Sequence, residues 1–188
     1  MSSEDDSGGS GSVVTVLIDV KEPRLPSDET TEAIVIGAGI AGSAMAFALG
    51  VQRRRVIALE RDLSEPNRIV GELLQPGGVE TLNALGLGEC VEDIDAQAIQ
   101  GYVVIRGEDQ ISLTYPNSVL GVAFHHGRFV QRLRAAAEQH RESGLVDLRQ
   151  GTAVALLEDR ASGRVVGVEW RAPRAKETRR IFAPLTVE

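Results

Sequence analysis

The clearest chemistry in this chain lies in a glycine-rich turn between two apolar runs. An apolar run at residues 34–36 is followed by Gly-Ala-Gly-Ile-Ala-Gly at 37–42, and residues 44–49 are small and helix-forming. A second apolar run, residues 56–59, ends on the acid Glu60. This order is the fingerprint of a βαβ unit that binds an adenine dinucleotide: a strand, a G-x-G-x-x-G turn, a helix, and a second strand that ends on an acid.

Each part of that fingerprint has a physical role. Gly37 permits a backbone turn that a Cβ atom would block, and Gly39 lets the chain approach a pyrophosphate closely. Gly42 and Ala46 keep the helix close to the sheet, and the free N–H groups of its first turn face the phosphates. Glu60 is placed to accept hydrogen bonds from ribose hydroxyls. A glycine-rich turn that only packs a βα unit would leave this acid unexplained.

Glu60 by itself does not separate NAD from FAD as the ligand. Two features favour FAD. Arg61 and a long segment reaching Arg68 follow the acid, which suits a cofactor that extends beyond its adenosine. The later part of the chain also indicates a β-meander, where a nicotinamide-binding domain would continue its βα alternation.

The remaining pattern predicts an acidic, disordered tail and linker over residues 1–30 and one domain over 31–188. Residues 13–20 are either a separate strand or a tether, and residues 61–75 are a long connection. Pro76 to Leu85 reads as a helix, with Pro76 in its first turn and Gly86 just past its end. A β-hairpin is expected from runs 99–105 and 110–115, and a helix over 127–140. The predicted meander strands are 146–148, 154–157, 165–170 and 180–187.

Composition excludes several other classes of protein. The net charge of −7 arises mainly from residues 1–32, which hold eight acids and two bases, so the rest is near neutral. Nothing therefore favours nucleic-acid binding. Cys90 is the only cysteine, and no apolar run approaches the ~20 residues that span a bilayer. His125 and His126 would point to opposite faces of a strand, so we interpret them as structural and expect no metal site.

Beyond the fingerprint, a series of blocks resembles the squalene monooxygenase (squalene epoxidase) family. The resemblance covers nearly all of residues 33–187, in the order of the family. The blocks are Glu60–Gly78, Ile94–Gln97 with Gly101-Tyr102, Tyr115-Pro116, Phe124–Phe129 and Ala183–Val187. Generic flavin hydroxylases share the glycine turn and Glu60-Arg61 but not this whole series.

The resemblance implies a role for particular residues. Tyr102 matches a tyrosine needed for activity, and Gln75 matches its hydrogen-bonding neighbour near the flavin. The expected FAD-binding positions are Gly37, Gly39, Ile40, Ala41, Gly42, Glu60, Arg61, Arg68, Leu73, Arg134 and Ala153. From the residues alone, Arg68 and Arg134 are plausible phosphate or ring-edge partners, because a guanidinium binds phosphate in a bidentate manner.

The implied fold class is α/β, an FAD-binding Rossmann-like βαβ of the flavin monooxygenase type with a β-hairpin and a C-terminal β-meander. The implied function is FAD-dependent epoxidation of squalene to 2,3-oxidosqualene in sterol biosynthesis. Electrons would come from NADPH through a cytochrome reductase partner, at the endoplasmic reticulum membrane. The protein would orient the substrate and exclude water while the cofactor carries the chemistry.

One departure from the family concerns the far end of the domain. The family's Asp-Gly motif after Ala183–Thr186, and a later Gly-Asp motif that contacts the rest of FAD, have no counterpart in residues 1–188. We therefore expect an incomplete domain, the N-terminal FAD-binding portion of such an enzyme. A non-catalytic FAD-binding or partner-binding fragment and another flavin-dependent hydroxylase are the alternatives.

Overall fold

A four-stranded parallel sheet forms the centre of the molecule. The computed structural model describes residues 14–21, 24–69 and 72–188. In this sheet β3 (Ala33–Ile36) and β4 (Val56–Glu60) are neighbours, and β10 (Val146–Gln150) and β14 (Leu185–Val187) lie at the edges. All three pairings are parallel, so the carboxyl ends of the strands share one edge. The predicted βαβ unit is present, with α1 (Ile40–Val51) between β3 and β4.

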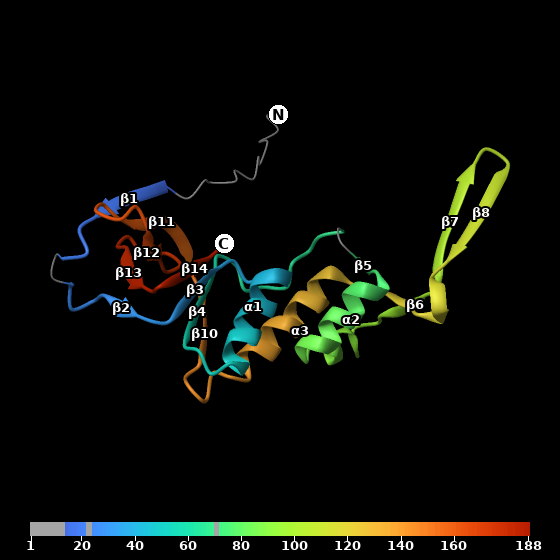
Figure 1. Cartoon of the computed structure of the whole chain (residues 1–188), viewed down its shortest axis with the longest axis horizontal. Coiled ribbons are helices and arrows are strands. Elements are labelled where there is room, and N and C mark those ends of the chain that lie inside the picture. Colours follow the sequence, from blue (N-terminus) through green and yellow to red (C-terminus); the bar gives the residue numbers. More distant parts are fainter. Residues whose placement is uncertain (1–13, 22–23, 70–71) are drawn as a thin grey trace, which may run out of the picture.

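Alternating side chains make this sheet the middle of three layers (Figure 1). Val35 and its neighbours on one face join a core cluster with the helices, whereas Ile34 and Ile57 join a second cluster with the other sheet. Because successive strand residues point to opposite faces, an apolar run of four residues can bury both faces. The uninterrupted apolar character of β3 and β4 thus reflects their central position.

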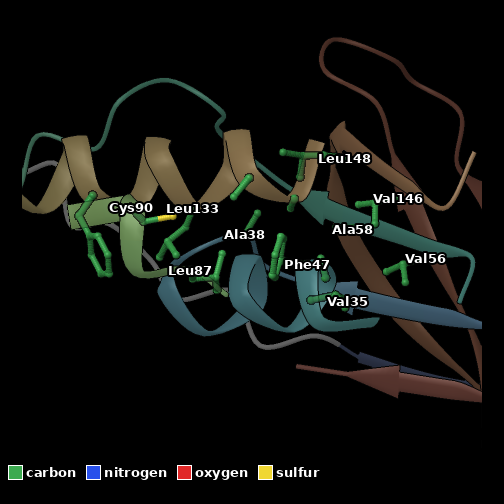
Figure 2. Close-up of a cluster of buried hydrophobic side chains, with 14 of the residues drawn as sticks. Val35, Ala38, Phe47, Val56, Ala58, Leu87, Cys90, Leu133, Val146 and Leu148 are labelled. Atoms are coloured by element: carbon green, nitrogen blue, oxygen red, sulfur yellow. The ribbon is translucent and has the colours of Figure 1, made fainter. Parts of the chain in front are cut away.

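Helices α1 and α3 (His126–Glu138) cover one side of the parallel sheet, and α2 (Pro76–Leu85) lies beyond them, away from the sheet (Figure 1). Figure 2 shows their core, where Phe47 lies toward side chains from three parallel strands and Leu133 lies beside Leu87 and Cys90. The bounds of α2 are as predicted, with Pro76 at its first turn and Gly86 in the left-handed conformation at its end. Such a glycine ends a helix without the steric cost of a Cβ atom.

The second sheet lies on the other side and has five strands in the order β1-β11-β12-β13-β2. Its strands are β1 (Val14–Ile18), β2 (Glu29–Thr30), β11 (Thr152–Asp159), β12 (Val165–Arg171) and β13 (Arg179–Phe182). Of the predicted meander, only β11, β12 and β13 form one. The first predicted strand is β10, which pairs with β4 because Val146 and Leu148 bury their side chains against the helices.

The last predicted strand, 180–187, is two strands in different sheets. Pro184 lies in the break between β13 and β14, and proline has no N–H to donate to a continuous ladder. Part of the expected tail and linker is also ordered, since β1 pairs with β11 and β2 pairs with β13. This agrees with the strand alternative for residues 13–20. Residues 1–13 lie outside the described part of the chain, and the domain boundary near residue 31 stays a prediction.

Short strands and a hairpin complete the chain beyond the helices. Strands β5 (Leu73–Leu74), β9 (Gly121–Ala123) and β6 (Gln97–Ile99) form a small sheet. The predicted hairpin is β7 (Gly101–Arg106) with β8 (Asp109–Thr114), and it projects from the far end of the molecule (Figure 1). The histidine pair was placed wrongly on a strand: His125 is the residue before α3, and His126 is its first residue.

The core between α1, α3 and the sheet predicts a measurable cost for one truncation. Leu133 is fully buried, so Leu133→Ala removes contacts and leaves a cavity, and should lower the free energy of unfolding by about 2–5 kcal/mol. Leu113→Ala, on the exposed hairpin, is the matched control and should change it by less than about 0.5 kcal/mol. Urea denaturation measures both. Equal effects of the two variants would contradict this description of the core.

Candidate cofactor site

The principal cleft of the described residues opens at the carboxyl ends of β3 and β4, where β11 begins. It has a volume of about 710 Å³, within the range of small-molecule sites. In parallel α/β sheets, this edge is where ligands bind. The lining residues are Ile36, Gly37, Gly39, Leu59, Glu60, Arg61, Asp62, Ser64, Glu65, Pro66, Asn67, Arg68, His126, Val130, Arg134, Gly151, Thr152, Ala153 and Glu188.

The glycine turn forms one wall of the cleft. Gly37 has φ of +88°, a conformation that favours glycine, and its N–H donates to the Leu59 carbonyl at 2.7 Å. A Cβ atom at Gly42 would lie 1.9 Å from the Gly37 carbonyl oxygen, so α1 packs directly on the turn only because residue 42 is glycine. Beside Gly39, by contrast, no atom lies within 4 Å of the Cβ position. That open space admits a ligand next to the backbone.

The start of α1 supplies the positive pole of the site. Gly39 precedes the helix and has no side chain to cap it, and no acidic residue lies in the first turn. The N–H groups of a first helical turn have no partner inside the helix. Ile40 and Ala41 therefore offer backbone donors to an anion, together with the favourable end of the helix dipole.

Glu60 is held in place by two backbone donors. One carboxylate oxygen accepts the Ala38 N–H at 2.8 Å, and the other accepts the Asp62 N–H at 3.1 Å. The side chain is 15% exposed. Each carboxylate oxygen has two acceptor positions, so capacity remains for hydroxyl donors from the cleft. The structure thus joins the acid at the end of β4 to the glycine turn.

Arg134 reaches the same place from α3, and its side chain is only 5% exposed. Its Nε donates to the Ala38 carbonyl at 2.8 Å, and its terminal nitrogens donate to the carbonyls of Ser64 at 3.1 Å and Asp62 at 3.2 Å. A terminal nitrogen also lies 3.6 Å from the Glu60 carboxylate. This guanidinium connects α3, the glycine turn and the segment after β4.

The electrostatics of the cleft follow from this arrangement. Burial lowers the pKa of the Arg134 guanidinium, while the carboxylates of Glu60 and Asp62 act in the opposite direction. Hydrogen bonds from Ser64 lower the pKa of Asp62. Arg61 and Arg68 are exposed residues in the lining. The cleft therefore presents an acid beside the turn and cationic side chains along the segment that follows.

Of the predicted cofactor residues, seven line the cleft and four do not. The seven are Gly37, Gly39, Glu60, Arg61, Arg68, Arg134 and Ala153. Ile40, Ala41 and Gly42 follow directly on the lining residue Gly39 and belong to α1. Leu73 is on β5, where it pairs with Ala123 and is not among the lining residues. Its predicted role has no geometric support here.

Gln75 and Tyr102, the predicted catalytic pair, do lie together. The Gln75 side-chain amide donates to the Tyr102 hydroxyl, and the rings of Tyr102 and Tyr115 meet edge to face with centroids 5.5 Å apart. Neither Gln75 nor Tyr102 lines the cleft. They are at the start of α2 and the base of the hairpin, and their catalytic role stays a prediction.

The cleft also includes residues that sequence reasoning missed. Gly151 and Thr152 enter it because β10 runs parallel to β4, which brings the end of β10 to the same edge. His126 and Val130 enter from the first turns of α3. A signal for the first pair was available in the apolar alternation of Val146 and Leu148 followed by a glycine. For His126 we find no comparable signal.

Two further observations concern what the described residues lack. Within residues 14–21, 24–69 and 72–188, no group of three or more histidine, cysteine or acidic side chains is arranged to hold a metal ion. None of the helices in that same part of the chain has the length and apolarity needed to cross a bilayer.

Solved structures with similar folds include a halogenase and a reductase-like protein. A myxobacterial chondrochloren halogenase, described as FAD-dependent, matches with a TM-score of 0.71 and 24% identity, over 84% of this chain and 36% of that one. A geranylgeranyl bacteriochlorophyll reductase-like protein from Thermoplasma acidophilum matches with a TM-score of 0.69 and 19% identity, over 85% and 38%. The chain thus shares its fold with these proteins.

No family model matches the sequence, but several curated proteins are similar to it. It is 46% identical over 180 residues to squalene epoxidase 1 of Arabidopsis thaliana, covering 93% of this chain and 33% of that protein. It is 41% identical to a squalene epoxidase of Schizosaccharomyces pombe, over 85% and 35%, and 42% identical to mouse squalene monooxygenase, over 83% and 28%. In sequence the chain is therefore similar to squalene epoxidases and monooxygenases, and it spans about a third of the length of these relatives.

The contact between Gly42 and the turn gives a prediction for the site. Gly42→Ala places a methyl group against the Gly37 carbonyl, and backbone must shift to admit it, so the free energy of unfolding should fall by about 1–3 kcal/mol. Gly77→Ala, in α2 with open space at its Cβ position, is the control and should be neutral or slightly stabilising. Thermal unfolding of both variants measures the difference. A stable Gly42→Ala protein would refute the close packing of α1 on the turn.

Proposed function

We propose that the cleft binds FAD, with the adenosine at Glu60 and the diphosphate at the start of α1. The observation that carries this proposal is the joining of the glycine turn to Glu60 through the Ala38 N–H, at the carboxyl edge of a parallel sheet. The open space at Gly39 and the uncapped first turn of α1 fit a diphosphate. The residues present therefore suit a dinucleotide.

Different residues of the cleft would contact different parts of the cofactor. Glu60 accepts hydrogen bonds from the ribose, and the N–H groups at Ile40 and Ala41 receive the diphosphate. Arg61 and Arg68 add positive charge along the wall, and Ala153 contributes a small side chain near the adenosine end. Bound FAD would supply oxygen-transfer chemistry that no side chain can provide. The protein's part is to bind, orient and exclude water.

We further propose that the chain is the cofactor-binding portion of an enzyme that epoxidises squalene to 2,3-oxidosqualene in sterol biosynthesis. The support is 41–48% identity to squalene epoxidases over 85–93% of the chain for the first four relatives. Since the chain spans about a third of such proteins, turnover would need residues beyond these 188. An NADPH-dependent cytochrome reductase as electron donor and the endoplasmic reticulum membrane as location belong to the same proposal.

Titration of the purified chain with FAD, followed by flavin fluorescence, tests the binding site. Glu60→Gln should weaken FAD binding about tenfold, or about 1.4 kcal/mol, because an amide cannot accept from both the Ala38 and Asp62 N–H groups and loses the charge. Glu80→Gln, an exposed acid on α2, is the control and should bind as the unaltered chain does.

The outcomes separate the functions considered. FAD binding without squalene turnover identifies the 188 residues as a cofactor-binding portion, and squalene turnover by a protein with the full length of its relatives tests the reaction. Turnover of an aromatic substrate instead would assign the chain to another group of flavin hydroxylases. Absence of FAD binding by the folded chain, or equal affinity of the Glu60 and Glu80 variants, would contradict the proposed site.

A further inference from the structure

The backbone of Ala38 is held from both sides. Its N–H donates to Glu60 at 2.8 Å, and its carbonyl accepts from Arg134 Nε at 2.8 Å and from the Ser43 hydroxyl at 3.1 Å. We propose that Arg134 is a positioning residue, which fixes the glycine turn and the segment after β4 in the arrangement that receives the cofactor. This inference rests on the proposed function of the cleft.

The donors of Arg134 are largely committed to backbone. A guanidinium has five N–H donors in a rigid fork, and here three nitrogens donate to the carbonyls of Ala38, Ser64 and Asp62. Ala38 belongs to the glycine turn, and Asp62 and Ser64 belong to the segment that follows β4. Glu60 lies between these two segments and bonds to both. The side chain is buried, so this geometry is not shared with competing water. A guanidinium used in this way shapes the cleft more than it contacts a ligand.

The two segments need such a restraint from outside. The turn contains Gly37 and Gly39, which have no side chains of their own to anchor it, and glycine has the largest conformational freedom of any residue. Segment 61–69 contains no helix or strand. Glu60 bonds the N–H groups of both segments, and Arg134 from α3 bonds their carbonyls. Arg134 thus ties two irregular segments to a helix, and holding them before binding removes an ordering cost from cofactor affinity.

A positioning role and a direct phosphate contact predict different behaviour for Arg134→Lys. Lysine keeps the positive charge and binds phosphate as a point charge, so a direct contact would survive in large part. Lysine has no planar fork and cannot reproduce three diverging bonds to carbonyls. Under the positioning role, Arg134→Lys should thus disturb the turn even in cofactor-free protein.

The first experiment measures amide hydrogen exchange in the cofactor-free chain. Arg134→Lys should raise exchange at residues 37–39 and 60–64 at least tenfold, with β11–β13 unchanged. Arg132→Lys, an exposed neighbour on the same helix, is the control and should leave both regions unchanged. No change at residues 37–39, or an equal rise throughout the chain, would overturn the proposal, because the second outcome marks only general stability.

The second experiment compares FAD with ADP, which carries only the adenosine and diphosphate. Arg134→Lys should weaken both by the same factor, about tenfold, since both depend on the turn. Retained ADP affinity would overturn the positioning role. Failure of the unaltered chain to bind either ligand would count against the proposed function, and the exchange experiment would still test Arg134 separately.

The unaltered protein gives a check that needs no variant. In ¹⁵N-labelled chain, the Arg134 Nε–H should exchange with solvent at least tenfold more slowly than that of the exposed Arg132, because it donates to the buried Ala38 carbonyl. Equal exchange at the two side chains would overturn the proposal even if the lysine variant fails to fold.

Discussion

The hydrogen bonds to the Ala38 backbone are the constraint on which the rest of the site depends. Its N–H is satisfied by an acid from the end of β4, and its carbonyl by an arginine from α3. Three elements far apart in the chain thus converge on the backbone of one residue. The acid gains two backbone donors, the buried guanidinium gains carbonyl partners, and each polar group is satisfied where water has little access.

The three-layer packing makes that convergence possible. Alternation along β3 and β4 directs one set of side chains to the helices and the other to the second sheet. This alternation fixes the register of both strands, because a shift by one residue would exchange the two sets. Gly42 then lets α1 approach the turn, and the fully buried Phe129 and Leu133 anchor α3 so that Arg134 points to the cleft. The chemistry of the site is polar, but its geometry is set by apolar burial.

Local features were predictable from the sequence, and long-range ones were not. The turn at Gly37–Gly42, the acid Glu60 and both ends of α2 follow from rules about neighbouring residues, and the structure has them. The pairing of β10 with β4 and of β14 with β3 depends on which strand lies alongside, which a short apolar run does not encode. Arg134 was predicted as a cofactor residue, but its partners are carbonyls brought near by tertiary structure.

The similarity of this chain to squalene epoxidases in sequence and to an FAD-dependent halogenase in fold supports the FAD site that we propose in the cleft. The most direct measurement is a crystal structure of the chain grown with FAD. We predict that the ribose hydroxyls contact Glu60, that the diphosphate lies at the first turn of α1, and that the Arg134 guanidinium still contacts the Ala38 carbonyl. FAD bound elsewhere, or Arg134 released from Ala38 to contact the diphosphate, would contradict this prediction.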